Sequence, residues 1–304
     1  MTYFLKKIAQ IVPVLLIISF VVFIFVNVSG DPVVLMLPEN ASNEEIQAMR
    51  EAMGLDKPVI VQYGIFLLNV LQGEFGQSFI YKQEALPIVL ERLPATFELM
   101  TAAIFVSIII SIPLGVLSAI KKNSAIDLFI SGSSVLGKAM PNFWLGLMLV
   151  LLFSVYFQWF PVSGRGSLSH LILPAITTGT AMAAEITRML RSKMLDVLHQ
   201  DYMRTARSKG LSRFNVIYRH GLRNSLLPVI TLIAINISTL VGGALVTEVV
   251  FAWPGIGQLV ISAVHARDMA VVQACMFVIA LLVIGANLMA DLLYRVVDPR
   301  ITYK

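Results

Sequence analysis

The stretch RMLRSKMLDVLHQDYMRTARSKGLSRFNVIYRHGLR, residues 188–223, is a basic polar segment between long apolar runs. It holds nine lysines and arginines against two acids, Asp196 and Asp201. The runs on both sides are long enough to cross a bilayer, so this basic segment must leave the membrane. We interpret it as a docking site for a soluble partner. The alternative is a solvated loop that only fixes membrane topology.

Composition places the chain among integral membrane proteins. Apolar residues make up 57% of the chain, charged residues only 13%, and mean hydropathy is +0.81. A soluble domain carries about 25% charged residues. The net charge of +5 does not indicate nucleic-acid binding, because the basic residues flank membrane segments and act as topology signals. The one cysteine, Cys275, excludes an intrachain disulfide and a multi-cysteine metal site.

Charge-free windows predict six membrane-spanning helices, since a spanning helix needs about 20 apolar residues. The six windows are Ile8–Gly30, Leu99–Ile120, Ala139–Gly164, Gly166–Ala184, Asn224–Thr247 and Met269–Ala290. Two other charge-free runs are not expected to span. Pro58–Gly73 is short and partly polar, which favours an interfacial helix. Val249–Ala266 contains Trp-Pro-Gly, which favours an outside loop or a re-entrant segment.

Charges in the loops orient these helices. Basic residues precede the first window, follow the second, form the basic segment after the fourth, and follow the sixth. They share one side only if there are six spans with both termini in the cytoplasm. On the other side, residues 31–94 carry nine acids and four basic residues. The alternative for the first window, a cleaved signal peptide, fits its long apolar stretch and poor cleavage site less well.

The sequence therefore predicts an all-α integral membrane protein in two parts. Residues 1–95 hold the first spanning helix and an external acidic segment, and residues 96–304 form a five-helix core with a cytoplasmic loop at 188–223. In the external segment, Ser42 and Glu45 have the spacing of a capping box. They predict a short amphipathic helix that ends at Gly54.

No catalytic or metal-binding constellation stands out. Gly132–Lys138 nearly spells a phosphate-binding loop, but Ala139 stands where Ser or Thr would hold Mg²⁺. The four histidines have no paired spacing, and neither a His-Glu-x-x-His motif nor a Gly-x-Ser-x-Gly motif occurs. Mid-membrane Asn236 either lines a pathway or bonds a neighbouring helix, while Glu248 and Asp291 lie near span ends, where local pairing accounts for them.

The basic segment has the pattern of a short helix. Asp201 is expected to cap it and Gly210 to end it. Helical spacing places four side chains on one face: Tyr202, Thr205, Ala206 and Lys209. Such a helix, lying parallel to the membrane, fits a groove in a soluble domain.

Several segments, taken in order, resemble the permeases of bacterial ABC importers in the dipeptide/oligopeptide/nickel branch. The resemblance covers nearly the whole chain. It rests on the following segments: Gly30-Asp-Pro32, Gly54-Leu-Asp56, Gly73-Glu-Phe-Gly76, Arg92-Leu-Pro-Ala-Thr96, Pro141-Asn-Phe-Trp-Leu-Gly146, Pro161-Val-Ser-Gly-Arg165, Leu173-Pro-Ala-Ile176, Asp201–Gly210, Glu248–Gly255 and Asp298-Pro-Arg300. The widespread permease signature has Glu-Ala-Ala before the glycine, where this chain has Arg204-Thr205-Ala206, a difference typical of the peptide branch.

This resemblance implies a type I ABC importer permease in the bacterial inner membrane, most closely one for dipeptides or oligopeptides. The chain would form half of the pathway, contact lipid, and pair with a second, similar permease. Two cytoplasmic ATPase subunits would bind ATP and Mg²⁺, and an extracytoplasmic binding protein would deliver substrate. The chain itself would hold no cofactor and catalyse no reaction. The ATPase-coupling element would be the 201–213 helix, with these residues: Asp201, Tyr202, Arg204, Thr205, Ala206, Lys209 and Gly210.

Two alternatives follow from the same residues. Importers of nickel, glutathione or other small solutes share these motifs, because substrate choice rests largely with the binding protein. An ATP-independent channel or carrier is the alternative from another class, and it predicts no ATPase partner.

Overall fold

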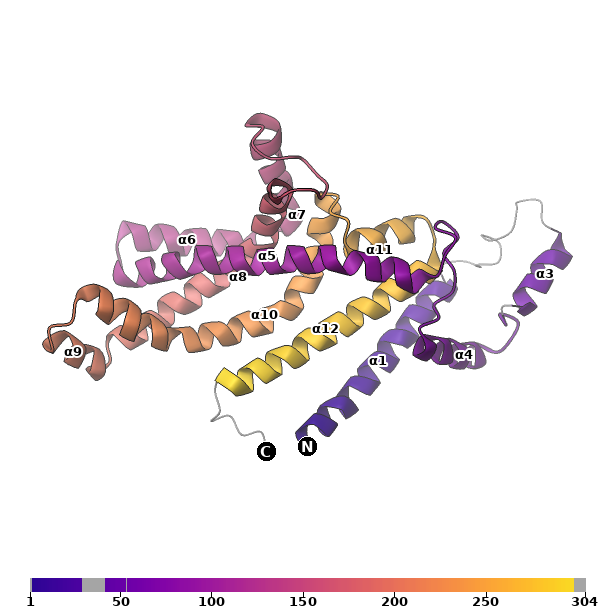
Figure 1. Ribbon diagram of the computed structural model, residues 1–304, viewed down its shortest axis with the longest axis horizontal. Helices are drawn as coiled ribbons and strands as arrows, with labels where there is room; N and C mark the ends of the chain where they lie inside the picture. Colours follow the sequence, from indigo (N-terminus) through magenta and orange to yellow (C-terminus); the bar gives the residue numbers. More distant parts are fainter. Residues whose placement is uncertain (1, 29–41, 53, 298–304) are drawn as a thin grey trace. The chain divides into compact units, whose positions relative to one another are not determined.

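The computed structural model describes residues 2–28, 42–52 and 54–297, and it is helical almost throughout (Figure 1). The helices in chain order are α1 (Thr2–Val28), α3 (Asn43–Ala52), α4 (Val59–Gln72), α5 (Ala85–Ile120), α6 (Ala125–Ala139), α7 (Asn142–Leu149), the π-helix η1 (Val150–Tyr156), α8 (Leu168–Leu198), α9 (Asp201–Ser208), the π-helix η2 (Asn215–Leu222), α10 (Arg223–Val250), α11 (Ile256–His265) and α12 (Met269–Val297). Within the described residues, extended pairing is limited to an isolated bridge between Gln77 and Glu84.

The chain divides into two compact units. Unit 1 comprises Met1–Pro94 and Gln258–Ile284, and unit 2 comprises Ala95–Gly257 and Gly285–Lys304. The division expected from the sequence, 1–95 and 96–304, concerns membrane topology, so these units do not test it and it stays a prediction.

Three helical stretches are long and apolar enough to cross a membrane: Ala85–Ile120, Asn215–Val250 and Met269–Leu292. A fourth candidate is α6 taken with α7 and η1, a pair bent by 109°. The described ranges thus supply three or four of the six predicted spans. The first predicted span coincides with α1, whose described apolar stretch is Ile11–Ile24.

Helix α8 corrects the fourth predicted window. It runs on to Leu198, so residues 188–198 of the basic segment are helical and the loop expected there was wrong. Ile186, Leu190 and Met194 are fully buried at successive turns, and this apolar stripe continues the helix past its charged residues. The same stripe can be read from the sequence, but a window defined by charge alone ends at Ala184, before it begins.

The third predicted window, Ala139–Gly164, contains α7 and η1, but the chain breaks at its start. Met140 and Pro141 are extended, with ψ of 129° and 135°, and Pro141 precedes the first turn of α7. Proline has no N–H to continue α6, but it is well placed before a new helix. Helix α6 itself was missed because it carries Asp127 and Lys138.

Other sequence expectations are confirmed. Ser42 and Glu45 form the capping box that begins α3, with the Glu45 amide donating to Ser42 Oγ at 3.2 Å and the Ser42 amide to Glu45 Oε2 at 2.8 Å. Helix α4 occupies the segment predicted as a short helix and ends at left-handed Gly73. The Val249–Ala266 run does not span, as predicted, because it holds only the end of α10 and the 10-residue α11. The second predicted window, in contrast, starts too late, because α5 begins at Ala85 rather than at Leu99.

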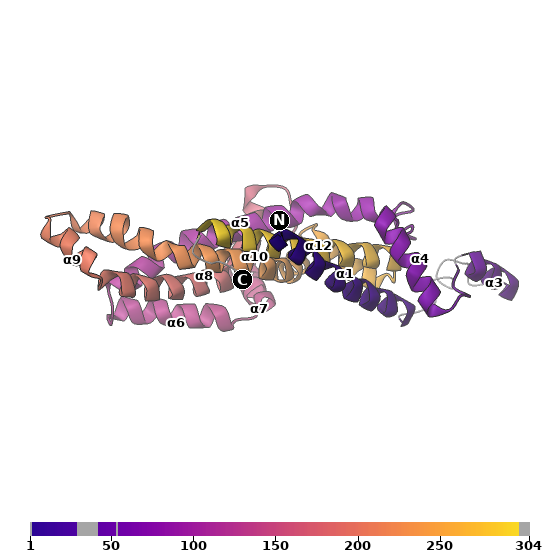
Figure 2. The ribbon, with the colours of Figure 1, turned by 90° about the horizontal axis from the view of Figure 1, so that it is seen from below.

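In unit 2, α8 packs against α6, α7 and α10 (Figure 2). Glycine allows α8 to approach α5 closely, since a Cβ on Gly179 would lie 2.6 Å from the Ala103 carbonyl oxygen. In unit 1, α1 packs against α4 through Tyr63, whose hydroxyl donates to the Leu16 carbonyl at 3.0 Å and whose ring meets Phe20 and Phe23.

Candidate functional site

Helix α9 lies at one end of unit 2, between the end of α8 and the start of η2 (Figures 1 and 2). The helix predicted from Asp201 is confirmed. Seven residues proposed for docking lie in it or directly after it: Asp201, Tyr202, Arg204, Thr205, Ala206, Lys209 and Gly210.

The two faces of α9 differ sharply. Met203 is fully buried and Ala206 is 7% exposed, while Tyr202, Thr205 and Lys209 lie in solvent. The expected common face of Tyr202, Thr205, Ala206 and Lys209 is therefore wrong for Ala206. Positions 203 and 206 are three apart, so they form an apolar stripe of their own, which points inward.

The buried stripe fixes α9 to its neighbours. Met203 and Ala206 pack with Val216 of η2, and Val197 and Leu198 at the end of α8 pack against this cluster. One polar contact adds to it, because Asn224 Nδ2 donates to Tyr202 Oη at 3.2 Å. The sequence reasoning named Tyr202 and Ala206 but missed Met203, the most buried residue of the helix.

The ends of α9 differ in part from the expectation. Gln200, not Asp201, is the N-cap residue, and it makes no side-chain capping bond. Asp201 lies in the first turn, where its negative charge interacts favourably with the helix dipole and stabilises the helix. Gly210 follows the helix with φ of +73°, so the predicted glycine stop is confirmed.

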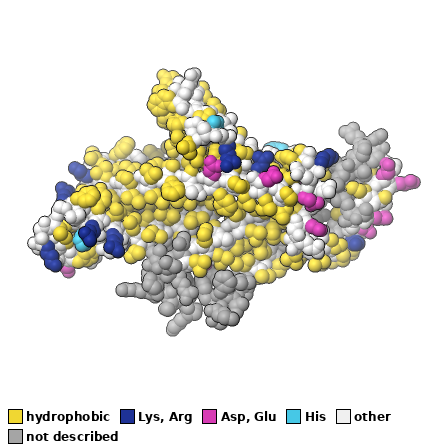
Figure 3. Space-filling model, viewed as in Figure 1, with side chains coloured by type: hydrophobic (Ala, Val, Ile, Leu, Met, Phe, Trp, Pro, Cys, Tyr) yellow, Lys and Arg dark blue, Asp and Glu magenta, His cyan; other side chains and the backbone are white. Residues whose placement is uncertain are grey.

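A cavity of about 450 Å³ lies beside α9. Its walls come from α5, α8, α9, η2 and the turn after α9, and it is lined by Ala119, Ile120, Leu198, Arg207, Leu211, Arg213, Val216 and Ile217. Its floor is apolar and two arginines flank it. Lysine and arginine side chains gather over this end of unit 2 (Figure 3). The surface therefore suits a partner with apolar and acidic groups.

Two ion pairs tie α6 to α8, one near each end of α6. Asp127 accepts two hydrogen bonds from Arg191, at 2.6 and 2.7 Å, and Lys138 pairs with Glu185. Arg191 belongs to the basic segment, so part of that segment serves internal packing. The carboxylate beside it raises the pKa of the Arg191 guanidinium.

A buried carboxylate organises the opposite end of α10. Glu248 is fully buried and accepts from Thr96 Oγ1 at 2.7 Å and from the Gly257 amide at 2.6 Å. Thr96 Oγ1 in turn accepts from the Ile256 amide at 3.0 Å. The first amides of α11 are thereby satisfied by side chains, as a helix N-terminus requires.

The position of the Glu248 carboxylate and its surroundings explain the two glycines at 255 and 257. A Cβ on Gly255 would collide with the Glu248 carboxylate, and one on Gly257 would lie 2.5 Å from the Leu245 Cα. Only glycine fits at either position. The local pairing expected for Glu248 is confirmed, and its partner Thr96 was not foreseen.

Three segments that carried the resemblance meet around Trp253, five residues after this carboxylate. Trp253 Nε1 donates to the Ala95 carbonyl at 2.8 Å, and Arg165 pairs with Glu98 at 2.6 Å while its guanidinium lies 5.8 Å from the Trp253 ring centroid. The motifs at 92–96, 161–165 and 248–255, together with Glu98, thus form one contact network. Asn236 lies elsewhere in α10, half-buried, and donates to the Leu232 carbonyl of its own helix at 3.0 Å.

Comparison with known proteins now decides the family. The family described as binding-protein-dependent transport system inner membrane component matches residues 111–303, and its N-terminal counterpart matches residues 1–100. The chain belongs to this family. It is a permease subunit of an ABC importer in the inner membrane, and so a pathway component rather than an enzyme.

Relatives of this permease match over their full length. The oligopeptide transport system permease protein AppB of Bacillus subtilis is 42% identical over 99% of both chains. The dipeptide transport system permease protein DppB of Escherichia coli is 39% identical over 99% of both, and the glutathione transport system permease protein GsiC of Pectobacterium atrosepticum is 39% identical over 100% of both.

The fold of the permease agrees with a solved importer. A chain of the MetNI methionine ABC transporter, in an inward-facing conformation, superposes with a TM-score of 0.56 at 17% identity. The match covers 69% of this chain and 96% of that one. The fold is therefore that of an ABC importer's membrane chain.

Proposed function

We propose that this permease forms one half of the pathway of a peptide importer and couples to its ATPases through α9. The names of AppB and DppB, which match over 99% of both chains, support dipeptides or oligopeptides as the substrate class. The proposed assembly has a second permease, two ATPase subunits that bind ATP and Mg²⁺, and an extracytoplasmic binding protein. Six spans place both termini and α9 in the cytoplasm, in keeping with the basic residues of the loops.

The observation that carries the coupling proposal is the two-faced character of α9. Its outer face presents Tyr202, Arg204 and Lys209 to solvent, while Met203 and Ala206 are buried against η2 and α8. A helix that is only solvated needs no such anchor. With the anchor, a displacement of α9 moves the ends of α8 and η2 with it, because packed interfaces shift as units.

The test is co-purification with the ATPase subunits from mild detergent. Arg204→Glu reverses a charge on the outer face of α9 without touching its buried stripe. Lys122→Glu makes the same change on the exposed turn after α5 and serves as the control. We expect the first variant to lose most of the ATPase at unchanged yield and the second to keep it. Equal retention in both variants would overturn the assignment of α9.

Glutathione is the second candidate substrate, because GsiC matches this chain as closely as DppB does. Uptake into proteoliposomes with the co-purified binding protein separates the two. Import of a tripeptide that glutathione does not inhibit supports the peptide assignment. Import of glutathione that the tripeptide does not inhibit supports the glutathione assignment.

A further inference from the structure

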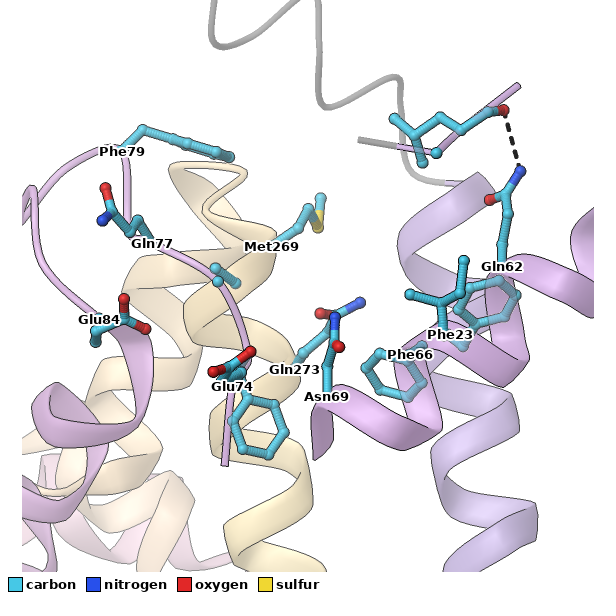
Figure 4. Close-up of a pocket in the computed structure, with 16 residues that line it drawn as sticks. Phe23, Gln62, Phe66, Asn69, Glu74, Gln77, Phe79, Glu84, Met269 and Gln273 are labelled. Atoms are coloured by element: carbon cyan, nitrogen blue, oxygen red, sulfur yellow. Dashed lines mark hydrogen bonds between the residues drawn. The ribbon is translucent and has the colours of Figure 1, made fainter. Parts of the chain in front are cut away.

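A cavity of about 500 Å³ opens in unit 1, far in sequence from α9 (Figure 4). Its walls come from α1, α4, the segment 74–79 and the start of α12. This volume lies within the range of about 300–1,000 Å³ typical of small-ligand sites. No part of the coupling surface contributes to it.

The side chains that line the cavity suit a cationic ligand that also forms hydrogen bonds to amides. It includes the carboxylates of Glu74 and Glu84 and no lysine, arginine or histidine. Neither carboxylate forms an ion pair with another residue in the described parts of the chain. Three primary amides are added by Asn69, Gln77 and Gln273.

The polar groups are spread along the cavity. In Figure 4 the Glu74 carboxylate lies beside the amides of Asn69 and Gln273. Gln77 lies on the loop that follows Glu74, and Glu84 lies just before the start of α5. The rings of Phe66 and Phe79 also line it. A ligand in this space meets negative charge, amide donors and acceptors, and aromatic surface together.

The wall that carries Glu74 and Gln77 is held firmly. Ser78 is buried and its hydroxyl donates to the buried carboxylate of Asp268, next to the start of α12. The Tyr81 amide donates back to Ser78 Oγ at 2.9 Å, and the Ala85 amide to the Gly76 carbonyl at 3.0 Å. A wall fixed this way forms the cavity before any ligand arrives, which limits the entropy lost on binding.

We propose that this cavity binds the amino-terminal end of a peptide. The terminal ammonium group lies between Glu74 and Glu84, the primary amides bond the peptide backbone, and the rings of Phe66 and Phe79, on opposite sides of the cavity in Figure 4, contact different side chains of the peptide. Charge-assisted bonds of an ammonium to two carboxylates supply the selectivity for a free amino terminus. This inference rests on the proposed function, since it takes peptides as the substrate.

Other ligand chemistries fit less well. Transition metals favour histidine or cysteine ligands, and neither residue lines the cavity. An anionic solute would meet two carboxylates and no basic side chain. A basic side chain of a docked protein has the same ammonium chemistry as a peptide terminus, so the experiment must separate these two sources.

The experiment measures binding of trialanine to the complete transporter in nanodiscs, without its binding protein, by isothermal titration calorimetry. We expect Glu74→Gln and Glu84→Gln each to raise the Kd about tenfold. Glu91→Gln, on an exposed face of α5 outside the cavity, should leave it unchanged. N-acetyl-trialanine should bind weakly to the wild type, and neither glutamate variant should weaken its binding further. Gln273→Leu, an uncharged change, repeats the test if a glutamate variant assembles poorly.

The outcomes separate this inference from the proposed function. If the wild type imports peptides but Glu74→Gln, Glu84→Gln and Gln273→Leu bind trialanine normally, the cavity is not a peptide site and the function stands. If those variants instead lose affinity only for the binding protein, the cavity receives a basic side chain of that protein and the peptide site is overturned. If the wild type neither binds nor imports peptides, the proposed function itself fails.

Discussion

Arg191 holds Asp127 by two parallel hydrogen bonds, from Nε to Oδ1 at 2.6 Å and from Nη2 to Oδ2 at 2.7 Å. Asp127 is buried and also accepts from the Ser118 hydroxyl and, at 2.8 Å, from the Asn123 amide. The pair joins the start of α6 and the end of α5 to the part of α8 that leads into α9. A displacement of α9 that moves the end of α8 would therefore be transmitted through this pair to α5 and α6.

Asp127→Asn is expected to weaken both the fold and the coupling. The change leaves the partly buried Arg191 without its counter-charge, which costs about 3 kcal/mol for an ion pair broken from one side. We expect a lower melting temperature in detergent and less transport for each ATP hydrolysed by the assembled importer.

The matched control is Lys193→Ala, which removes an exposed ion pair with Asp196 on the same helix. Exposed pairs contribute about 0–1 kcal/mol, so this variant should behave as the wild type. Equal losses in the two variants would show that the effect belongs to the charge of α8 and not to the buried pair.

Much of this architecture could be predicted from the sequence because a bilayer makes apolar length informative. The helices at 223–250 and 269–297 fall where charge-free windows placed them. The predicted helix boundaries are wrong where charged residues form ion pairs inside the protein. Asp127 and Arg191 each argued against a buried helix when taken alone, and only the fold reveals that they neutralise each other.

The candidate site was predictable to a similar extent. Gly210 and the helix before it follow from local rules for helix ends. The anchoring role of Met203 depends on Val216 and Leu198, and the pairing of Glu248 with Thr96 joins residues far apart in the chain. Contacts of this kind have no local signature, so one sequence does not predict them.

Gly255→Ala is expected to disrupt the fold around Glu248. The added Cβ would collide with that carboxylate, which is held from the other side by Thr96 and the Gly257 amide. Overpacking of this kind costs about 1–3 kcal/mol, and here it also threatens the hydrogen bonds of a buried charge. Thermal unfolding and yield in detergent provide the measurement.

Gly242→Ala is the control for this prediction. Gly242 lies in α10 with open space around it, so alanine should be neutral or slightly stabilising there. A stable Gly255→Ala protein would mean that Glu248 can move aside, and the account given for this glycine would then be wrong.

Met203→Ala is expected to uncouple α9 while leaving its outer face intact. Truncating a fully buried methionine costs about 2–5 kcal/mol, which loosens the cluster with Val216 and Leu198. Amide hydrogen exchange should quicken in α9 and in η2. Transport should fall more than ATPase co-purification does, whereas Arg204→Glu should reduce both together.

The capping box of α3 makes that helix sensitive to acid. The amide and hydroxyl of Ser42 donate to Glu45, and these bonds lower the pKa of the Glu45 carboxyl below its usual value. A depressed pKa means that the stabilisation is complete above the unfolded value of about 4.3 and is lost as pH falls below it. Amide exchange in α3, corrected for its intrinsic pH dependence, should therefore quicken between about pH 5 and 3. Glu45→Gln should flatten this dependence, and Glu44→Gln, one residue away and outside the box, should preserve it. An unchanged profile in Glu45→Gln would mean that another group sets the acid sensitivity of α3.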